Sequence, residues 1–199
     1  MISKKTLSLA LAAALLSAGY AQASTELVSN GGFESFTGGP VSGYVTVNAG
    51  DTSLTGWTVG AASVDVVNGN YGAITGNSID MLGTPGPGSL EQTLATVAGQ
   101  HYTLNFDLSE NSNAAPQLYV SLNNGATPML YTGTGTPQHY SLDFTAGAST
   151  MLTFTSATSG NSGAVLDNVS VMAVPEPETY AMLLAGLGLM GFIARRRKA

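Results

Sequence analysis

Apolar and polar residues alternate in short runs through the central part of the chain, which is the period of a β-strand with one buried face. In the clearest run, HYTLNFDL at 101–108, an apolar or aromatic side chain stands at every second position. Clusters of Gly, Asn, Pro and Ser separate the runs, and almost no stretch has the period of a helix. The pattern predicts an all-β domain, an antiparallel β-sandwich of roughly eight to ten strands. The clearest expected strands are 101–108, 117–122, 139–145, 151–156 and 166–171.

The N-terminal segment has the pattern of a secretory signal peptide. Two lysines precede an apolar run over 7–16, and the tripeptide AQA at 21–23 fits the small-x-small rule for signal peptidase. We expect signal peptidase to cut after Ala23, so that 1–23 is removed. The alternative is an N-terminal anchor helix, but a helix needs about 20 apolar residues to span a bilayer and this run is shorter.

A second apolar stretch lies near the C-terminal end, where 179–194 carries no charge and is followed at once by a basic cluster. As a helix it would be about 24 Å long, a little less than a hydrocarbon core of about 30 Å. We expect a single transmembrane helix and basic end at 179–199, with the basic cluster on the cytoplasmic side of the inner membrane. The domain at 24–172 then lies outside that membrane, joined to the helix by a linker at 173–178. The basic cluster consists of Arg195, Arg196, Arg197 and Lys198.

The linker contains the sequence VPEPE, with Pro175, Glu176 and Pro177. Pro-Glu-Pro, a short apolar helix and a terminal Arg cluster, in this order, resemble the PEP-CTERM sorting signal of Gram-negative bacteria. The resemblance implies recognition by an exosortase and transient anchoring in the inner membrane. It also implies a final place at the cell surface or in the extracellular matrix, among exopolysaccharide and biofilm components. The two prolines prevent a helix or strand from continuing into the anchor and keep an extended, accessible peptide there. The alternative is a permanent single-span anchor with a proline-rich spacer.

Basic residues are confined to the two ends of the chain: the segment 24–174 has no Lys or Arg, against ten acidic residues. Binding to nucleic acid depends on Lys and Arg, so this composition excludes a nucleic-acid partner. Neutral glycans and divalent cations are compatible with an acidic domain. Any buried carboxylate in this domain needs hydrogen-bond donors or a metal, because no Lys or Arg is present to pair with it. Cysteine is absent, so the fold has no disulfide.

Four pieces of the domain occur in a recognisable order: LVSNGGFES near the start, GWTV, SLEQTLATVAGQHYTLNFDLS in the centre, and LDNVSV at the end. Together they resemble the choice-of-anchor C family and, more distantly, the galactose-binding-like jelly rolls that include many carbohydrate-binding modules. The resemblance covers nearly all of 26–172. It implies a two-sheet jelly roll in an exported protein that contacts carbohydrate or cell wall, with no established catalysis.

Jelly rolls of this kind often hold a structural calcium ion, and the resemblance implies Glu34 and Asp167 as ligands, with Asn30 as a further candidate. An independent argument concerns Asp167, which shares strand parity with the valines of the last strand and is therefore expected to face the core. A carboxylate there needs compensation, which Ca²⁺ supplies. Two alternatives stay open: a bulge at Leu166 turns Asp167 outward, or backbone N–H groups satisfy it.

Aromatic side chains are the candidates for ligand contact, because sugars stack on aromatic rings while nearby amides and carboxylates hydrogen-bond the hydroxyl groups. Trp57 is the only Trp, and its main alternative role is core packing between the two sheets. Tyr119 is of interest because it alternates away from the apolar side of its strand. The candidate set is Trp57, Tyr44, Tyr71, Tyr119 and Tyr131.

No motif in the sequence marks an active site, and we expect no enzymatic activity. The chain has no Cys, the domain has no Lys, and Ser162 lies outside any Gly-x-Ser-x-Gly elbow. A pair of catalytic carboxylates is compatible with ten acids, although nothing marks two of them as a pair. Two functions remain. One is a module that binds neutral extracellular polysaccharide or cell-wall glycan; the other is a structural biofilm-matrix protein with a calcium-stabilised acidic surface and no sugar site.

Overall fold

The computed structural model describes residues 25–111, 115–122, 128–160, 162–175 and 177–196. Within these, Glu26–Ala173 forms one compact unit and the C-terminal helix belongs to another. The signal peptide predicted at 1–23 lies outside the described residues, as do Glu176 and Arg197 of the predicted sorting signal.

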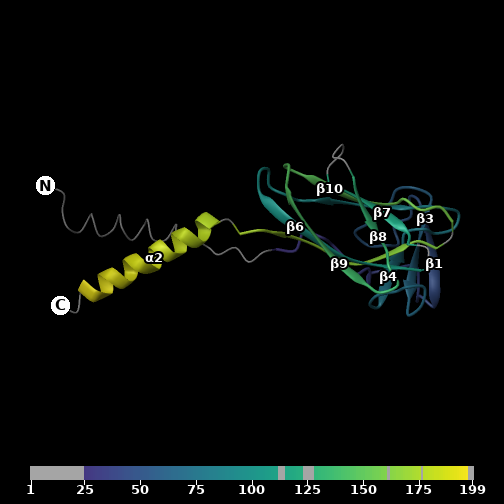
Figure 1. Cartoon of the computed structure of the whole chain (residues 1–199), viewed down its shortest axis with the longest axis horizontal. Coiled ribbons are helices and arrows are strands. Elements are labelled where there is room, and N and C mark those ends of the chain that lie inside the picture. Colours follow the sequence, from purple (N-terminus) through teal and green to yellow (C-terminus); the bar gives the residue numbers. More distant parts are fainter. Residues whose placement is uncertain (1–24, 112–114, 123–127, 161, 176, 197–199) are drawn as a thin grey trace. The chain divides into compact units, whose positions relative to one another are not determined.

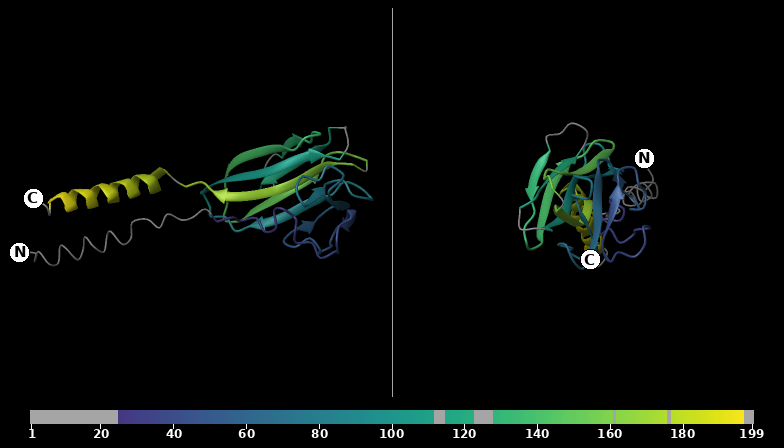
Figure 2. Two further views of the ribbon diagram at one scale, coloured as in Figure 1. Left: turned by 90° about the horizontal axis from the view of Figure 1, so that it is seen from below. Right: turned by 90° about the vertical axis from the view of Figure 1, so that its right-hand side faces the viewer.

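Eleven described strands form two antiparallel sheets that enclose a common core (Figure 1 and Figure 2). The six-stranded sheet has the order β1 (Gly43–Asn48), β3 (Ser63–Asn68), β4 (Asn77–Asp80), β11 (Ala164–Ala173), β6 (His101–Glu110) and β9 (Gln138–Thr145). The five-stranded sheet has the order β2 (Thr58–Val59), β5 (Ser89–Leu94), β10 (Thr150–Ser156), β7 (Gln117–Leu122) and β8 (Met129–Thr132). Every neighbouring pair is antiparallel. The predicted all-β antiparallel sandwich is confirmed, with eleven described strands where roughly eight to ten were expected.

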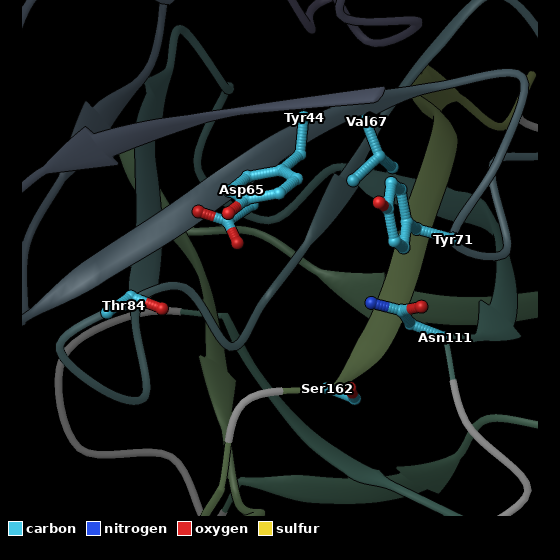
Figure 3. A pocket seen from close by; sticks show the side chains of 7 residues that line it. All are labelled: Tyr44, Asp65, Val67, Tyr71, Thr84, Asn111 and Ser162. Carbon is cyan, nitrogen blue, oxygen red and sulfur yellow. The ribbon is translucent and has the colours of Figure 1, made fainter. Parts of the chain in front are cut away.

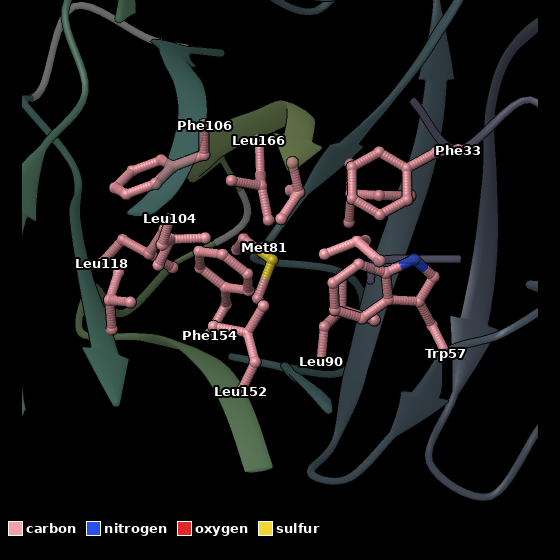
Figure 4. Close-up of a cluster of buried hydrophobic side chains, with 14 of the residues drawn as sticks. Phe33, Trp57, Met81, Leu90, Leu104, Phe106, Leu118, Leu152, Phe154 and Leu166 are labelled. Atoms are coloured by element: carbon pink, nitrogen blue, oxygen red, sulfur yellow. The ribbon is translucent and has the colours of Figure 1, made fainter. Parts of the chain in front are cut away.

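The core is built from the side chains that the alternating pattern assigned to the buried face (Figure 4). The five strands predicted most clearly are present as β6, β7, β9, β10 and β11. Phe106 of β6 and Phe154 of β10 belong to different sheets and meet with ring centroids 5.6 Å apart. Both side chains are fully buried, and each such burial contributes about 1.5–3 kcal/mol. Every second side chain of these strands therefore faces inward, and the packing of these side chains holds the two sheets together.

Hydrogen bonds join three of the sequence pieces that carry the family resemblance. Nε1 of Trp57 donates to the carbonyl oxygen of Asn30 at 3.0 Å. Gln92 in β5 donates through Nε2 to the carbonyl oxygens of Ser29 (3.0 Å) and Gly56 (2.8 Å), and its Oε1 accepts from the N–H of Ser29 at 2.7 Å. The LVSNGGFES piece, the GWTV piece and the central piece that begins with SLEQT are thus held to one another by partly buried polar contacts.

The opening piece also contacts the closing strand. The N–H of Val169 in β11 donates to the carbonyl oxygen of Gly31 at 3.0 Å. A Cβ atom at Gly31 would overlap the carbonyl oxygen of Val169, whereas one at Gly32 would meet no atom within 4 Å. The first glycine of the pair is therefore required by close backbone approach, and the second is not.

Strand β11 changes its facing in the middle. Its register with β6 shifts between Asp167 and Ser170, and Asn168 has a φ of 52°. Core positions fall on even-numbered residues up to Leu166 and on odd-numbered residues from Val169. Asp167 therefore faces away from the core, which corrects the expectation from strand parity, because a bulge reverses the alternation. The side chain is still fully buried.

The C-terminal helix α2 (Pro177–Arg196) begins two residues before the stretch predicted at 179–194. Proline is favourable at the first helical position, because the N–H it lacks has no intrahelical partner there. Arg195 and Arg196 lie in the last turn, where cations interact favourably with the helix dipole. Pro175 of the predicted sorting signal is exposed between β11 and α2. No helix in the described part of the chain is long and apolar enough to cross a membrane, so the expected transmembrane helix is not found.

Candidate functional site

A pocket of about 220 Å³ opens on the face of the six-stranded sheet that points away from the core (Figure 3). On β3 the side chains of Val64 and Val66 lie in the core. The alternate residues, Asp65 and Val67, therefore face the pocket. The polar residue in this otherwise apolar run is thus placed in a binding position by the alternation. The lining residues are Tyr44, Asp65, Val67, Tyr71, Thr84, Asn111 and Ser162.

Tyr44 and Tyr71 form an aromatic corner of the pocket. Their ring centroids are 5.7 Å apart and the ring planes are perpendicular. The exposed fractions of the two residues are 54% and 46%. Tyr71 has a φ of 57°, an uncommon backbone conformation for a residue other than glycine, and it directly precedes Gly72 with a φ of 78°. Two of the predicted ligand-contact residues are therefore brought into one pocket.

Asp65 lines the pocket although only 8% of the residue is exposed. Oγ1 of Thr46 on the neighbouring strand β1 donates to Oδ1 of Asp65 at 2.6 Å. Within the described part of the chain, no group donates a hydrogen bond to Oδ2. Burial raises the pKa of Asp65, and the Thr46 hydrogen bond partly opposes this shift. One oxygen of a desolvated carboxylate is thus available to a ligand.

Asp80 in β4 stands opposite Asp65 in the register of β3 with β4 and is fully buried. Its Oδ1 accepts the N–H groups of Leu82 (2.9 Å) and Gly163 (3.0 Å). Its Oδ2 accepts from Nδ2 of Asn111 at 2.6 Å. Burial raises the pKa of Asp80 to about 6; these hydrogen bonds oppose the shift and the nearby Asp65 carboxylate adds to it. Asp80 therefore holds the Asn111 amide in the pocket lining.

A buried carboxylate also fixes the segment 69–76, which carries one of the two pocket tyrosines. Oδ2 of Asp167 accepts from N and Oγ1 of Thr75, at 3.0 and 2.8 Å, and from Oγ of Ser78 at 3.1 Å. Oδ1 accepts from the N–H of Asn168 at 2.7 Å. Burial raises the pKa of Asp167, and these hydrogen bonds oppose the shift. The segment is thus tied to β11 on the outer face of the sheet.

The predicted calcium ligands make hydrogen bonds within the protein. Oε1 of Glu34 accepts from the N–H of Asn77 at 2.9 Å. The side chain of Asn30 accepts from the N–H of Ser35 and donates to its carbonyl oxygen. Both oxygens of Asp167 are occupied by N–H and O–H donors. The described residues contain no group of three or more acidic or histidine side chains that could hold a metal. Two carboxylates and an amide fall short of such a group, so the calcium site at Glu34, Asp167 and Asn30 stays a prediction.

Three further predicted contact residues lie away from the pocket. Trp57 is 4% exposed, with ring centroids 5.5 Å from Phe33 and 6.2 Å from Phe154 (Figure 4). Its assignment as a sugar platform is corrected accordingly, because a buried ring has no face for stacking. Tyr131 in β8 packs edge-on against Phe106 of β6, with ring centroids 5.0 Å apart. Tyr119 is exposed on β7, in the other sheet.

The residues that sequence reasoning missed are Asp65, Asp80 and Asn111. The two aspartates interrupt the apolar runs SVDVV and SIDML, and this was a usable signal. The two aspartates are close together because β3 pairs with β4, and this pairing cannot be predicted from the residue pattern of either strand alone.

The fold and pocket define a two-sheet β-sandwich module with an open aromatic and acidic site. Residues 26–172 match the family described as protein of unknown function (DUF642), and the chain belongs to this family. Residues 173–198 match the PEP-CTERM protein-sorting motif, which confirms the predicted sorting signal. The motif implies processing by an exosortase, export, and sorting to the cell surface.

Comparison with curated proteins gives a match to Halomucin from Haloquadratum walsbyi (strain DSM 16790 / HBSQ001), 33% identical over 166 residues and covering 76% of this chain. The chain spans only 2% of the length of Halomucin.

The domain resembles a number of solved structures, among them the two that follow. TmCBM61 in complex with β-1,4-galactotriose aligns with a TM-score of 0.50 at 12% identity, over 75% of this chain and 99% of that chain. The arabinose-bound MgGH51 α-L-arabinofuranosidase aligns with a TM-score of 0.52 at 15% identity, over 81% of this chain and 28% of that chain. At these identities the likeness shows a shared fold.

Proposed function

We propose that this surface-sorted protein binds neutral extracellular polysaccharide or cell-wall glycan through the pocket on its six-stranded sheet. The observation that carries the proposal is the position of two half-exposed rings, Tyr44 and Tyr71, beside the polar groups of Asp65 and Asn111. Sugars present an apolar face that stacks on an aromatic ring and hydroxyl groups that need hydrogen-bond partners. Both requirements are met in one pocket.

The charge of the domain narrows the class of glycan. The segment 24–174 contains no Lys or Arg, so a phosphorylated or uronic acid polymer meets no cation and a surplus of carboxylates. A carboxylate in the lining accepts hydrogen bonds from sugar hydroxyl groups without any such repulsion. Neutral polysaccharide is therefore favoured over acidic polysaccharide.

The fold comparison supplies the first ligand to test. TmCBM61, whose structure was solved with β-1,4-galactotriose, shares the fold of this domain. A β-1,4-linked galactan is thus the first neutral glycan in the panel, with β-glucans and xylans beside it.

We propose further that binding occurs without catalysis. Asp65 and Asp80 are neighbouring carboxylates, but Asp80 is fully buried and both of its oxygens accept hydrogen bonds from the protein. A glycosidase needs two carboxyl groups that flank the scissile bond and both reach the substrate. Only Asp65 of this pair faces the pocket.

The test is titration calorimetry of the purified full chain with the glycan panel, using Tyr44→Ala, Tyr71→Ala and the matched control Tyr119→Ala. Tyr119 is also an exposed tyrosine on a sheet surface but lies outside the pocket. We expect each pocket substitution to weaken binding by about tenfold, corresponding to about 1.4 kcal/mol, and the control to leave binding unchanged.

Two results would contradict the proposal. Equal weakening by Tyr119→Ala would place binding elsewhere on the surface. If no glycan of the panel binds detectably, the alternative function is favoured, a structural matrix protein without a sugar site.

A further inference from the structure

The acidic side of the pocket has no counter-charge in the protein. Asp65 lines the pocket, and Asp80 stands opposite it on the adjacent strand. The whole segment 24–174 contains no Lys or Arg. Two neighbouring carboxylates are therefore buried side by side with hydrogen bonds but without a cation, and such burial is costly.

The two carboxylates differ in what they offer a ligand. Asp80 is occupied by the N–H groups of Leu82 and Gly163 and by the amide of Asn111. Asp65 receives one hydrogen bond, from Thr46 to Oδ1, and in the described part of the chain none to Oδ2. Asp65 is also more than nine-tenths buried while lining an open pocket. A charged partner for Asp65 must therefore come from the ligand.

The aromatic corner favours the same kind of ligand. Tyr44 and Tyr71 expose about half of their surface beside Asp65 (Figure 3). A cation placed over a tyrosine ring is attracted by the negative face of the ring. An ammonium group that reaches Oδ2 of Asp65 would form a charge-assisted hydrogen bond, and the rings beside it would add to the attraction.

We propose that the pocket prefers a glycan that carries free, protonated amino groups, that is, a polymer of de-N-acetylated hexosamine, over its neutral counterpart. This inference rests on the proposed function: the pocket binds neutral saccharide, and it binds the aminated form of the same sugar more tightly. A divalent cation is a weaker candidate for the same place, because Asp65 alone offers a free oxygen and cations such as Ca²⁺ need six to eight oxygen ligands.

The experiment compares two trisaccharides that differ only in the acetyl groups, the trimer of glucosamine and the trimer of N-acetylglucosamine. Binding to the full chain is measured by titration calorimetry at pH 6 and low ionic strength, where the amino groups of the glucosamine trimer are protonated. We expect the glucosamine trimer to bind about tenfold more tightly than the acetylated trimer, and Asp65→Asn to bring the two affinities within about twofold.

The matched control is Asp143→Asn, which removes the same charge from an exposed position in β9. Asp143 accepts a hydrogen bond from Thr103, which an Asn side chain also accepts, and it lies outside the pocket. We expect this variant to keep the tenfold preference. An unfolding curve for each variant verifies that the protein is folded.

The outcomes separate this inference from the proposed function. Equal affinity for the two trimers, or an equal effect of Asp143→Asn and Asp65→Asn, overturns the amine preference. If neutral polysaccharide still binds in a manner that depends on Tyr71, the proposed function stands. If no saccharide of either kind binds, both the amine preference and the proposed function are wrong.

Discussion

Asp65 and Asp80 occupy directly opposed positions on the adjacent antiparallel strands β3 and β4. Side chains at such positions lie about 5 Å apart at their Cβ atoms, so the two carboxylates share one desolvated region. Burial raises the pKa of both, and that of Asp80 to about 6. The folded domain therefore binds protons that the unfolded chain releases.

This relationship predicts that the domain loses stability as the pH rises from acidic to neutral. An aspartate whose pKa is raised on folding stabilises the protein fully below its unfolded pKa of 3.8, and this contribution is lost as the pH rises through about 6. A shift of this size corresponds to about 3 kcal/mol for Asp80, and the raised pKa values of Asp65 and Asp167 act in the same direction.

The measurement is denaturant unfolding of the wild type and Asp80→Asn from pH 4 to pH 7. We expect the free energy of unfolding of the wild type to fall over this range and that of the variant to fall much less. Asp143→Asn, at an exposed position, should keep the wild-type slope. Parallel curves for wild type and Asp80→Asn would show that Asp80 does not titrate in this range.

A second prediction concerns the two glycines of the opening motif. Gly31→Ala should lower the free energy of unfolding by about 1–3 kcal/mol, because the added methyl group overlaps the carbonyl oxygen of Val169. Gly32→Ala is the matched control, since its methyl group would meet no atom within 4 Å. Chemical denaturation of both variants tests this, and equal stability of the two would contradict the contact.

Trp57 should report folding and not ligand binding. It is the only Trp of the chain and its ring is buried between the sheets, so its fluorescence emission should shift to longer wavelength on unfolding. Trp57→Phe removes the hydrogen bond to Asn30 and should cost about 1–3 kcal/mol. Saturation with a bound glycan should leave the emission maximum unchanged; a shift on saturation would argue for a sugar contact at this ring.

Calcium should have little effect on stability, because Asp167 already accepts four hydrogen bonds from protein donors. We expect equal unfolding midpoints in calcium and in a chelator. A site filled to about a hundred times its dissociation constant would add about 2.7 kcal/mol. A midpoint that falls in the chelator, with the difference abolished by Glu34→Gln or Asp167→Asn, would support the calcium site that the family resemblance implied.

The core faces of β6, β7 and β10 are predictable from the sequence because each strand is regular, so the period of two holds along its length. The facing of Asp167 is not predictable in this way. One extra residue in the bulge before Ser170 reverses the alternation, and the sequence LDNVSV contains no glycine to mark it.

The candidate site is predictable only in its chemistry. Tyr44 and Tyr71 are natural candidates because they are aromatic, but their meeting depends on a turn in which Tyr71 takes a positive φ. The proximity of Asp65 and Asp80 depends on strand register, which is set by the whole sheet. The residue types of the site can be read from short stretches of sequence, whereas the meeting of these residues in one pocket depends on the order and register of the strands.

The distribution of basic residues also determines how susceptible the protein is to cleavage by extracellular proteases. Proteases with the specificity of trypsin cut after Lys or Arg, and the chain offers them no peptide bond between Lys5 and Arg195. The whole β-domain is therefore resistant to this class of protease even when it is unfolded, while the basic end remains open to it. Resistance of this kind resides in the covalent chain, and it persists under conditions in which the protection given by folding is lost.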